Sequence, residues 1–373
     1  MVETGQVNDA VRRGRRRVAR RVLSTLLASA LIVTGVAWSA VALWPLGRER
    51  SAGIAGSSGE QPTAGGVQTI DVGATVARVR AGEGSVWALT VSASDNHYSL
   101  VRIDEKTGEL GHSISLGTPP AVSDFAVGEG AVWVVEPTLT GPSWDREPGH
   151  LLRIDSDTGR VDVTISVGVD PLGMALGAGS VWVLNYADNT VSRVDPATDQ
   201  VVATIHVGNG PAEATFGFGS LWVENENRTP TVMRIDPATN QVTATIVDVA
   251  RPVIGDGVVW VEGPGKPNGA IRQIDPATNS LTGAALGLDI EPALIAAGEG
   301  AVWIGKWYKS PTPCPGRCLL QGSFAYRRFD PATNSLAGPP IEVTGPSAGV
   351  IAGEALWAPV QGSTVVIRAP IGA

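Results

Sequence analysis

The sequence predicts an all-β protein, a seven-bladed β-propeller of four-stranded antiparallel blades preceded by one transmembrane helix. A tryptophan pattern occurs seven times, and the 46 Gly and 26 Pro residues exceed what helical proteins tolerate. An uncharged apolar run also precedes the repeats. The predicted organisation is a cytoplasmic basic tail at 1–21, an anchor at 22–44, a flexible linker at 45–66 and the propeller at 67–373.

The N-terminal region has the pattern of a membrane anchor. Seven arginines lie between Val11 and Arg21, and the uncharged run extends from Val22 to Trp44. At ~1.5 Å per residue the run spans about 35 Å, enough to cross a ~30 Å hydrocarbon core. A cleaved signal peptide with its site at Ala40–Ala42 is the alternative. The arginine bias predicts a cytoplasmic N-terminus in the plasma membrane and an extracytoplasmic propeller.

The net charge of −8 is divided unevenly along the chain. Residues 1–66 hold nine arginines against four acidic residues, whereas the rest holds 19 basic and 32 acidic residues. An acidic main domain repels polyanions. We therefore expect no nucleic acid among the partners.

The repeat is recognised by the pattern Gly-x-Gly-x-[Val/Leu]-Trp, in place of which the last copy reads Ala-Gly-Glu-Ala-Leu-Trp. Spacings of 38 to 54 residues between its tryptophans are typical of propeller blades. Each repeat reads as four strands, and around Trp222 these are 212–217, 220–225, 231–236 and 241–246. The tryptophans are Trp87, Trp133, Trp182, Trp222, Trp260, Trp303 and Trp357.

The two ends of the repeat region predict how the ring closes. The last repeat stops after its third strand, whereas Val67–Gly73 resembles the outer strand Val201–Gly208. We expect the N-terminal segment to supply the outer strand of the last blade, which leaves no open sheet edge.

The repeated Gly-x-Gly-x-Val-Trp-Val and Arg-[Ile/Val]-Asp-Pro-Ala-Thr-[Asn/Asp] motifs, over about residues 67–373, resemble the propellers related to streptogramin B (virginiamycin B) lyase and to YVTN/NHL-type bacterial repeat proteins. The lyase resemblance implies metal-assisted elimination by His and Glu residues near the central axis. None of the four histidines lies at the start of a predicted innermost strand. The sequence thus leans against catalysis and against a cofactor.

The repeated motifs allow a functional and a structural interpretation. Seven indoles would line a ligand face, or each would fill the same wedge between adjacent blades; their recurrence favours packing. The Asp-Pro-Ala-Thr segments would bind calcium or form turns capped by the Asp side chain. One carboxylate per turn favours the capped turn.

Cys314 and Cys318 lie in the longest insertion, in the segment Thr-Pro-Cys-Pro-Gly-Arg-Cys. Outside the cell they favour an intraloop disulfide. Zinc would need two further ligands, which the neighbouring sequence does not supply.

Ligands of propellers bind at the axial mouth, where the innermost strands begin. Nine positions before each pattern tryptophan, or eight in the last repeat, the residues are Arg78, Asp124, Gly173, Glu213, Arg251, Leu294 and Gly349. Their mixed charges predict either a polar or zwitterionic ligand or ion pairs among themselves.

Aromatic residues in unequal loops of the same face break the repeat symmetry. They are Trp144, Tyr186, Trp307 and Tyr308, the last two within the predicted loop Lys306–Lys309. Such side chains favour binding of a protein or of a polar small-molecule or sugar ligand, or they pack against their own loops.

Two functions follow from these residues. The first is a membrane-anchored extracytoplasmic propeller that binds a ligand or protein without catalysis, through the four mouth charges and the four loop aromatics. The second is a metal-dependent lyase or hydrolase with Asp124 and Glu213 as ligands or acid–base groups at the mouth.

Overall fold

A computed structural model of the chain describes residues 66–371, except 119–121, 139–146, 264–269, 288–292, 299, 310–321, 331–332, 334, 344–348 and 361. The chain separates into two units, Met1–Glu60 and Gln61–Ala373, and the described residues all belong to the second. The predicted anchor at 22–44 therefore lies outside them. The described part of the chain contains no helix that could serve as a membrane span.

The described residues form seven four-stranded antiparallel sheets. Blade 1 contains β2 (Thr75–Gly82), β3 (Ser85–Val91), β4 (Tyr98–Asp104) and β5 (Leu110–Gly117). Blade 2 contains β6 (Asp124–Gly128), β7 (Ala131–Glu136), β8 (Pro148–Ile154) and β9 (Val161–Val169). Blade 3 contains β10 (Pro171–Gly177), β11 (Ser180–Asn185), β12 (Thr190–Asp195) and β13 (Gln200–His206). Blade 4 contains β14 (Pro211–Gly217), β15 (Ser220–Asn225), β16 (Thr231–Asp236) and β17 (Gln241–Val247).

The remaining blades follow the same plan. Blade 5 contains β18 (Ala250–Gly255), β19 (Val258–Gly263), β20 (Ala270–Asp275) and β21 (Ser280–Gly287). Blade 6 contains β22 (Ala293–Gly298), β23 (Ala301–Lys309), β24 (Gly322–Asp330) and β25 (Ser335–Val343). Blade 7 contains β26 (Val350–Ala352), β27 (Ala355–Pro359), β28 (Val365–Pro370) and β1 (Gln68–Asp71).

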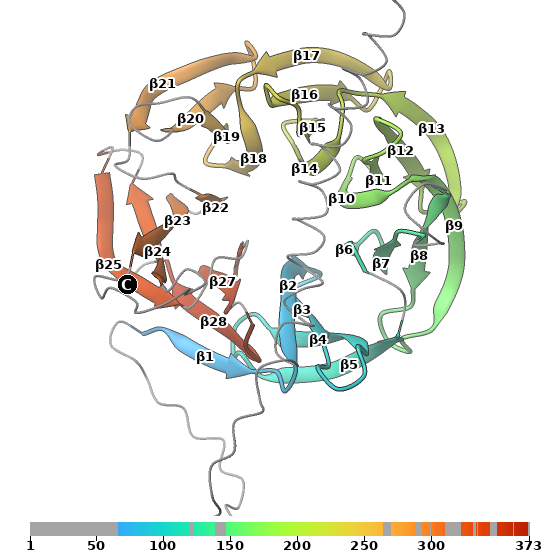
Figure 1. The fold of residues 1–373 in the computed structure, drawn as a ribbon, viewed down its shortest axis with the longest axis horizontal. Coiled ribbons are helices and arrows are strands. Elements are labelled where there is room, and N and C mark those ends of the chain that lie inside the picture. The colour runs from blue at the N-terminus through green and yellow to red at the C-terminus, as the bar shows by residue number, and fades with distance from the viewer. Residues whose placement is uncertain are drawn as a thin grey trace, which may run out of the picture. The chain divides into compact units, whose positions relative to one another are not determined.

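The blades are arranged radially around a central axis, with the first strand of each blade innermost and the last at the rim (Figure 1). This confirms the predicted seven-bladed propeller. The strands of blade 4 agree with the sequence prediction to within one residue.

The ring closes in the predicted way. β1 pairs with β28 in antiparallel register, from Gln68 opposite Arg368 to Asp71 opposite Val365. Residues from the two ends of the propeller therefore complete one sheet, which protects the outer edge of β28.

Each glycine of the repeat pattern has its own structural role. The first lies where adjacent blades approach closely, since a Cβ on Gly177 would come within 2.1 Å of the Phe216 ring. The second lies in the two-residue hairpin turn, where Ala178 and Gly179 have φ of 52° and 63°. Two successive positive φ values are those of a type I′ turn, which favours Gly.

The seven pattern tryptophans are packing residues, with exposed fractions between 0% and 4%. Trp182, for example, shares a hydrophobic cluster with Leu221 and Val223 of blade 4. Its Nε1 donates to the carbonyl of Gly177 at 3.0 Å. The packing interpretation is thereby confirmed.

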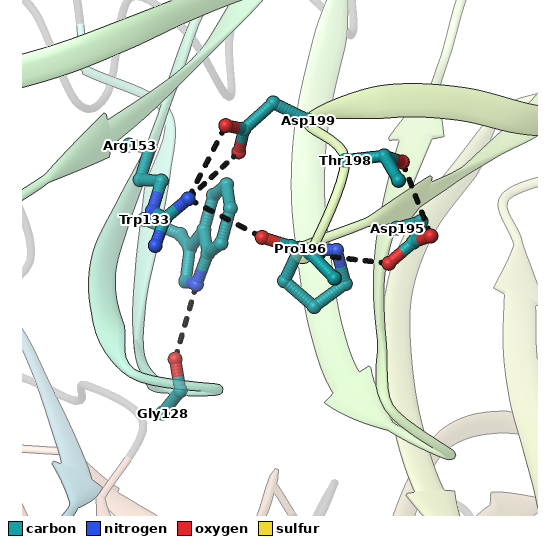
Figure 2. A network of polar contacts seen from close by, with 8 residues as sticks. Gly128, Trp133, Arg153, Asp195, Pro196, Thr198 and Asp199 are labelled. Atoms are coloured by element: carbon teal, nitrogen blue, oxygen red, sulfur yellow. Dashed lines mark hydrogen bonds and ion pairs between the residues drawn. The ribbon is translucent and has the colours of Figure 1, made fainter.

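The arginine of the second motif connects each of several blades to the next. In blade 2 the Arg153 guanidinium lies over the Trp133 ring, 5.8 Å from its centroid. Its Nη1 also donates to the Pro196 carbonyl at 3.3 Å and to Asp199 at 3.1 Å, both in the blade 3 turn (Figure 2). Arg193 of blade 3 makes the corresponding contacts with Trp182 and with the turn of blade 4. Arg234 of blade 4 makes them with Trp222 and with the turn of blade 5.

The Asp-Pro-Ala-Thr turn is capped by its own aspartate. Asp195 Oδ1 accepts the amide of Ala197 at 2.9 Å, and Oδ2 accepts the Thr198 hydroxyl at 3.1 Å (Figure 2). These bonds confirm the capped-turn interpretation. The turn exposes the Pro196 carbonyl and the Asp199 side chain to the arginine of the preceding blade.

Candidate functional site at the axial mouth

The charged mouth residues lie on the innermost strands, as predicted: Arg78 on β2, Asp124 on β6, Glu213 on β14 and Arg251 on β18. Strand register shifts near this end of β2, β10, β14, β18 and β22. The shifts of β14 and β18 include Glu213 and Arg251 themselves. A bulge re-aims the side chains of its residues, and it here occurs beside the axis.

Asp124 is held by two arginines of blade 1. Its Oδ1 lies 2.8 Å from Arg80 Nη2 and 3.3 Å from Arg78 Nη1. Oδ2 accepts the amide of Met174 on blade 3 at 3.3 Å, and the residue is only 3% exposed. Asp124 thus connects three neighbouring blades, and the ion pair expected as one alternative for Arg78 is present.

A second charged group joins blades 4 and 5 around Arg251. Its backbone amide donates to Oε2 of Glu224 at 3.0 Å, and its Nη1 lies 3.5 Å from Glu262 Oε1. Arg251 has a φ of 51°, a conformation that non-glycine residues seldom adopt. Such strain at a charged mouth is typical of residues placed for a purpose other than packing.

Glu224 is the most perturbed acid of this group. It is 6% exposed, and burial raises its pKa from 4.5 to about 8, with the negative charge of Glu213 adding to the effect. The amide and guanidinium of Arg251 act in the opposite direction. Burial and then Glu213 also raise the pKa of Glu226. The Arg251 group, which we define as Glu213, Glu224, Glu226, Arg251 and Glu262, can therefore hold a proton near neutral pH.

The sequence prediction missed Glu224, Glu226 and Glu262, although a signal was present for two of them. The second position after the pattern tryptophan is buried in six blades and half-buried in blade 5. Glu occupies it in blades 4 and 5, and the other blades have Leu89, Val135, Leu184, Gly305 and Pro359. A carboxylate that interrupts an otherwise apolar repeat position marks a place where function competes with packing.

The metal-ligand pair of the second hypothesis is not brought together by the described contacts. Asp124 and Glu213 lie on β6 and β14, with β10 between them in the ring (Figure 1). Among the described residues, no group of three or more His, Cys, Asp or Glu side chains is placed to hold a metal ion. A metal at Asp124 would have to displace its arginine partners.

The four loop aromatics have different outcomes. Tyr186 follows β11, and its ring lies against Gly210 of the next blade, where an added Cβ would be 3.0 Å from Cε2. Trp307 and Tyr308 were expected in a loop but belong to β23, opposite Phe324 and Ser323 of β24. The expectation was wrong because the two strands of this hairpin are longer than the corresponding strands of the other blades. Aromatic residues favour the extended strand conformation. Trp144 lies outside the described residues, as do Cys314 and Cys318.

No protein-family model and no curated protein matches the chain. Solved structures match its fold. A Kuenenia stuttgartiensis hydrazine synthase chain is 15% identical, with a TM-score of 0.57 over 76% of this chain and 92% of that one. The computationally designed Ika8 protein is 14% identical (TM-score 0.51, 80% and 98% covered), and U3-55K is 13% identical (TM-score 0.53, 79% and 98% covered). At these identities the likeness shows the propeller fold alone.

Proposed function

We propose that the protein is a membrane-anchored, extracytoplasmic propeller that binds a protein or polar ligand at its axial mouth without catalysis. The observation that carries the proposal is the asymmetry of the mouth. On a scaffold that repeats from blade to blade, charged side chains gather in the bulges of β14 and β18 and on β2 and β6. A binding site normally departs from the symmetry of its scaffold in this way.

The charge of the mouth indicates the kind of ligand. The Arg251 group has four carboxyl groups against one guanidinium, whereas Arg78 and Arg80 share a single aspartate. A ligand with a positive group opposite blades 4 and 5 and a negative group opposite blade 1 would complement this distribution. A zwitterionic small molecule or a protein surface of mixed charge fits the description.

The mouth is tested with the full-length protein and a Glu213→Gln/Glu226→Gln double variant. Partners are captured by crosslinking, and their affinities are then measured. We expect the double variant to bind at least about tenfold more weakly, since two charges facing the ligand are lost. The matched control is Glu83→Gln/Glu129→Gln, which removes the same charge from exposed hairpin turns at the other end of the inner strands. Equal binding by all three proteins would refute the mouth as the site.

A second candidate is acid–base catalysis at the mouth, of the metal-dependent kind that the streptogramin B lyase resemblance implies. Glu224 favours it, because a carboxyl group whose pKa lies at about 8 can act as a general acid at neutral pH. Thermal-shift measurements with Mg²⁺, Ca²⁺ and Mn²⁺, together with metal analysis, separate the two candidates. A rise in melting temperature that is lost in Glu213→Gln would show a metal site at the mouth, which the catalytic candidate requires and simple binding does not.

A further inference from the structure

A hollow of about 500 Å³ lies between blades 2 and 3, away from the axial mouth. Its walls come from β9 of blade 2 and from β12 and β13 of blade 3, which lie towards the rim of the ring (Figure 1). The volume is within the range of small-molecule sites. The polar side chains that line it are Ser166, Asp188, Thr190, Ser192, Thr204 and His206.

Two hydroxyl groups in this hollow are buried, each with a proton left to donate. Thr190 is 5% exposed and Ser192 is 3% exposed. Both accept hydrogen bonds from Asn185 Nδ2, at 3.0 Å and 2.9 Å. Since a hydroxyl that accepts can still donate its own hydrogen, both can donate to an occupant of the hollow.

Asn185 fixes these hydroxyl groups in position. It is fully buried, and its Oδ1 accepts the amide of Gly168 from blade 2 at 3.0 Å. That bond leaves only the amide NH₂ of Asn185 to face Thr190 and Ser192, so both hydroxyls must act as acceptors towards it. Oδ2 of Asp188 accepts the amide of Val169 at 2.7 Å. This leaves Oδ1 of Asp188 as an acceptor at the edge of the hollow.

One small residue leaves room for the hollow at this blade interface. The strand registers place Ser192 directly before Arg193, the residue that lies opposite the pattern tryptophan Trp182. At the same place the other blades have larger residues, namely Val101, Leu152, Met233, Arg272, Arg327 and Ile367. Blade 4 keeps the Asn and Thr as Asn225 and Thr231 but has Met233 where blade 3 has Ser192.

We propose that this hollow binds a sugar ring. Each sugar hydroxyl both accepts and donates, so it can accept from Thr190 and Ser192 while it donates to Asp188 Oδ1. Val167 and Val201 provide apolar wall for the C–H face of the ring. The site is separate from the axial mouth, and neither proposal depends on the other.

The test uses saturation-transfer NMR on the full-length protein with glucose, mannose and N-acetylglucosamine as probes. We expect transfer from at least one of them in the wild type. Ser192→Met, which introduces the residue of blade 4, should fill the hollow and weaken binding at least about tenfold. Thr190→Val should weaken it several-fold through loss of one hydroxyl, with thermal melting showing that the variant is folded.

Met233→Ser is the matched control, since it changes the equivalent place in blade 4 and should leave sugar binding unchanged. Comparing each monosaccharide with its β-1,4-linked dimer distinguishes a free sugar from the end of a glycan chain. The proposal fails if none of the probes shows transfer at millimolar concentration. It also fails if folded Ser192→Met and Thr190→Val bind as the wild type does.

Discussion

Replacing Trp182 by alanine should lower the free energy of unfolding by about 3–5 kcal/mol, the usual loss for a fully buried tryptophan. Trp182 is 0% exposed and fills the wedge between blades 3 and 4. The change also removes the bond to the Gly177 carbonyl and the ring beneath Arg193, whose guanidinium lies 4.8 Å from its centroid. Urea denaturation followed by circular dichroism measures the effect.

Phe218→Ala is the matched control for this change. Phe218 is an aromatic residue 39% exposed at the blade 4 hairpin turn, and its removal should shift stability by no more than about 0.5 kcal/mol. Trp182→Phe should cost less than the alanine variant, because the ring area is partly kept. A loss of under about 1 kcal/mol in Trp182→Ala would contradict the packing role.

Replacing Glu224 by glutamine should stabilise the protein above pH 8 and change little near pH 4.5. The pKa of Glu224 rises from 4.5 to about 8 on folding, so between these values the folded state holds a proton that the unfolded state has released. The stability of the wild type therefore falls as pH rises through this window. Glutamine can still accept the amide of Arg251 and carries no charge, so the variant escapes this loss, which is on the order of 5 kcal/mol.

Chemical denaturation at pH 4.5, 6, 7 and 8.5 measures the predicted difference between wild type and Glu224→Gln across the window given by the two pKa values. Glu83→Gln, at an exposed hairpin turn, provides the control. Its free energy of unfolding should change with pH in parallel with that of the wild type. If the two stability curves of wild type and Glu224→Gln stayed parallel, Glu224 would not carry a raised pKa. A variant less stable than the wild type at every pH would show that the carboxylate is required for its bond to Arg251.

The fold was predictable because its determinants recur along the chain. Seven copies of one pattern place seven tryptophans and seven hairpins. A strand boundary that is misjudged in one copy can therefore be corrected by comparison with the other copies. Gly177 and Gly179 show how local the requirements are, since one permits close approach of blades and the other permits a positive φ. The missing outer strand of the last repeat similarly required a partner, which Gln68–Asp71 provides.

The site was predictable only in part. Arg78, Asp124, Glu213 and Arg251 were found because their place in the repeat puts them on the innermost strands. Their partners were not found. The bond between the Arg251 amide and Glu224 joins residues of different blades, and a bulge in β18 decides where that amide points.

The sequence by itself determined the repeated features, namely the blade count, the closure, the buried tryptophans and the capped turns, since each depends on local geometry that a short motif specifies. The tertiary structure alone decided which charges are paired, where a carboxyl group retains its proton and where a small residue leaves a hollow between blades. These properties depend on burial and on distances between side chains from neighbouring blades. Motif spacing carries no such information until the blades are packed together.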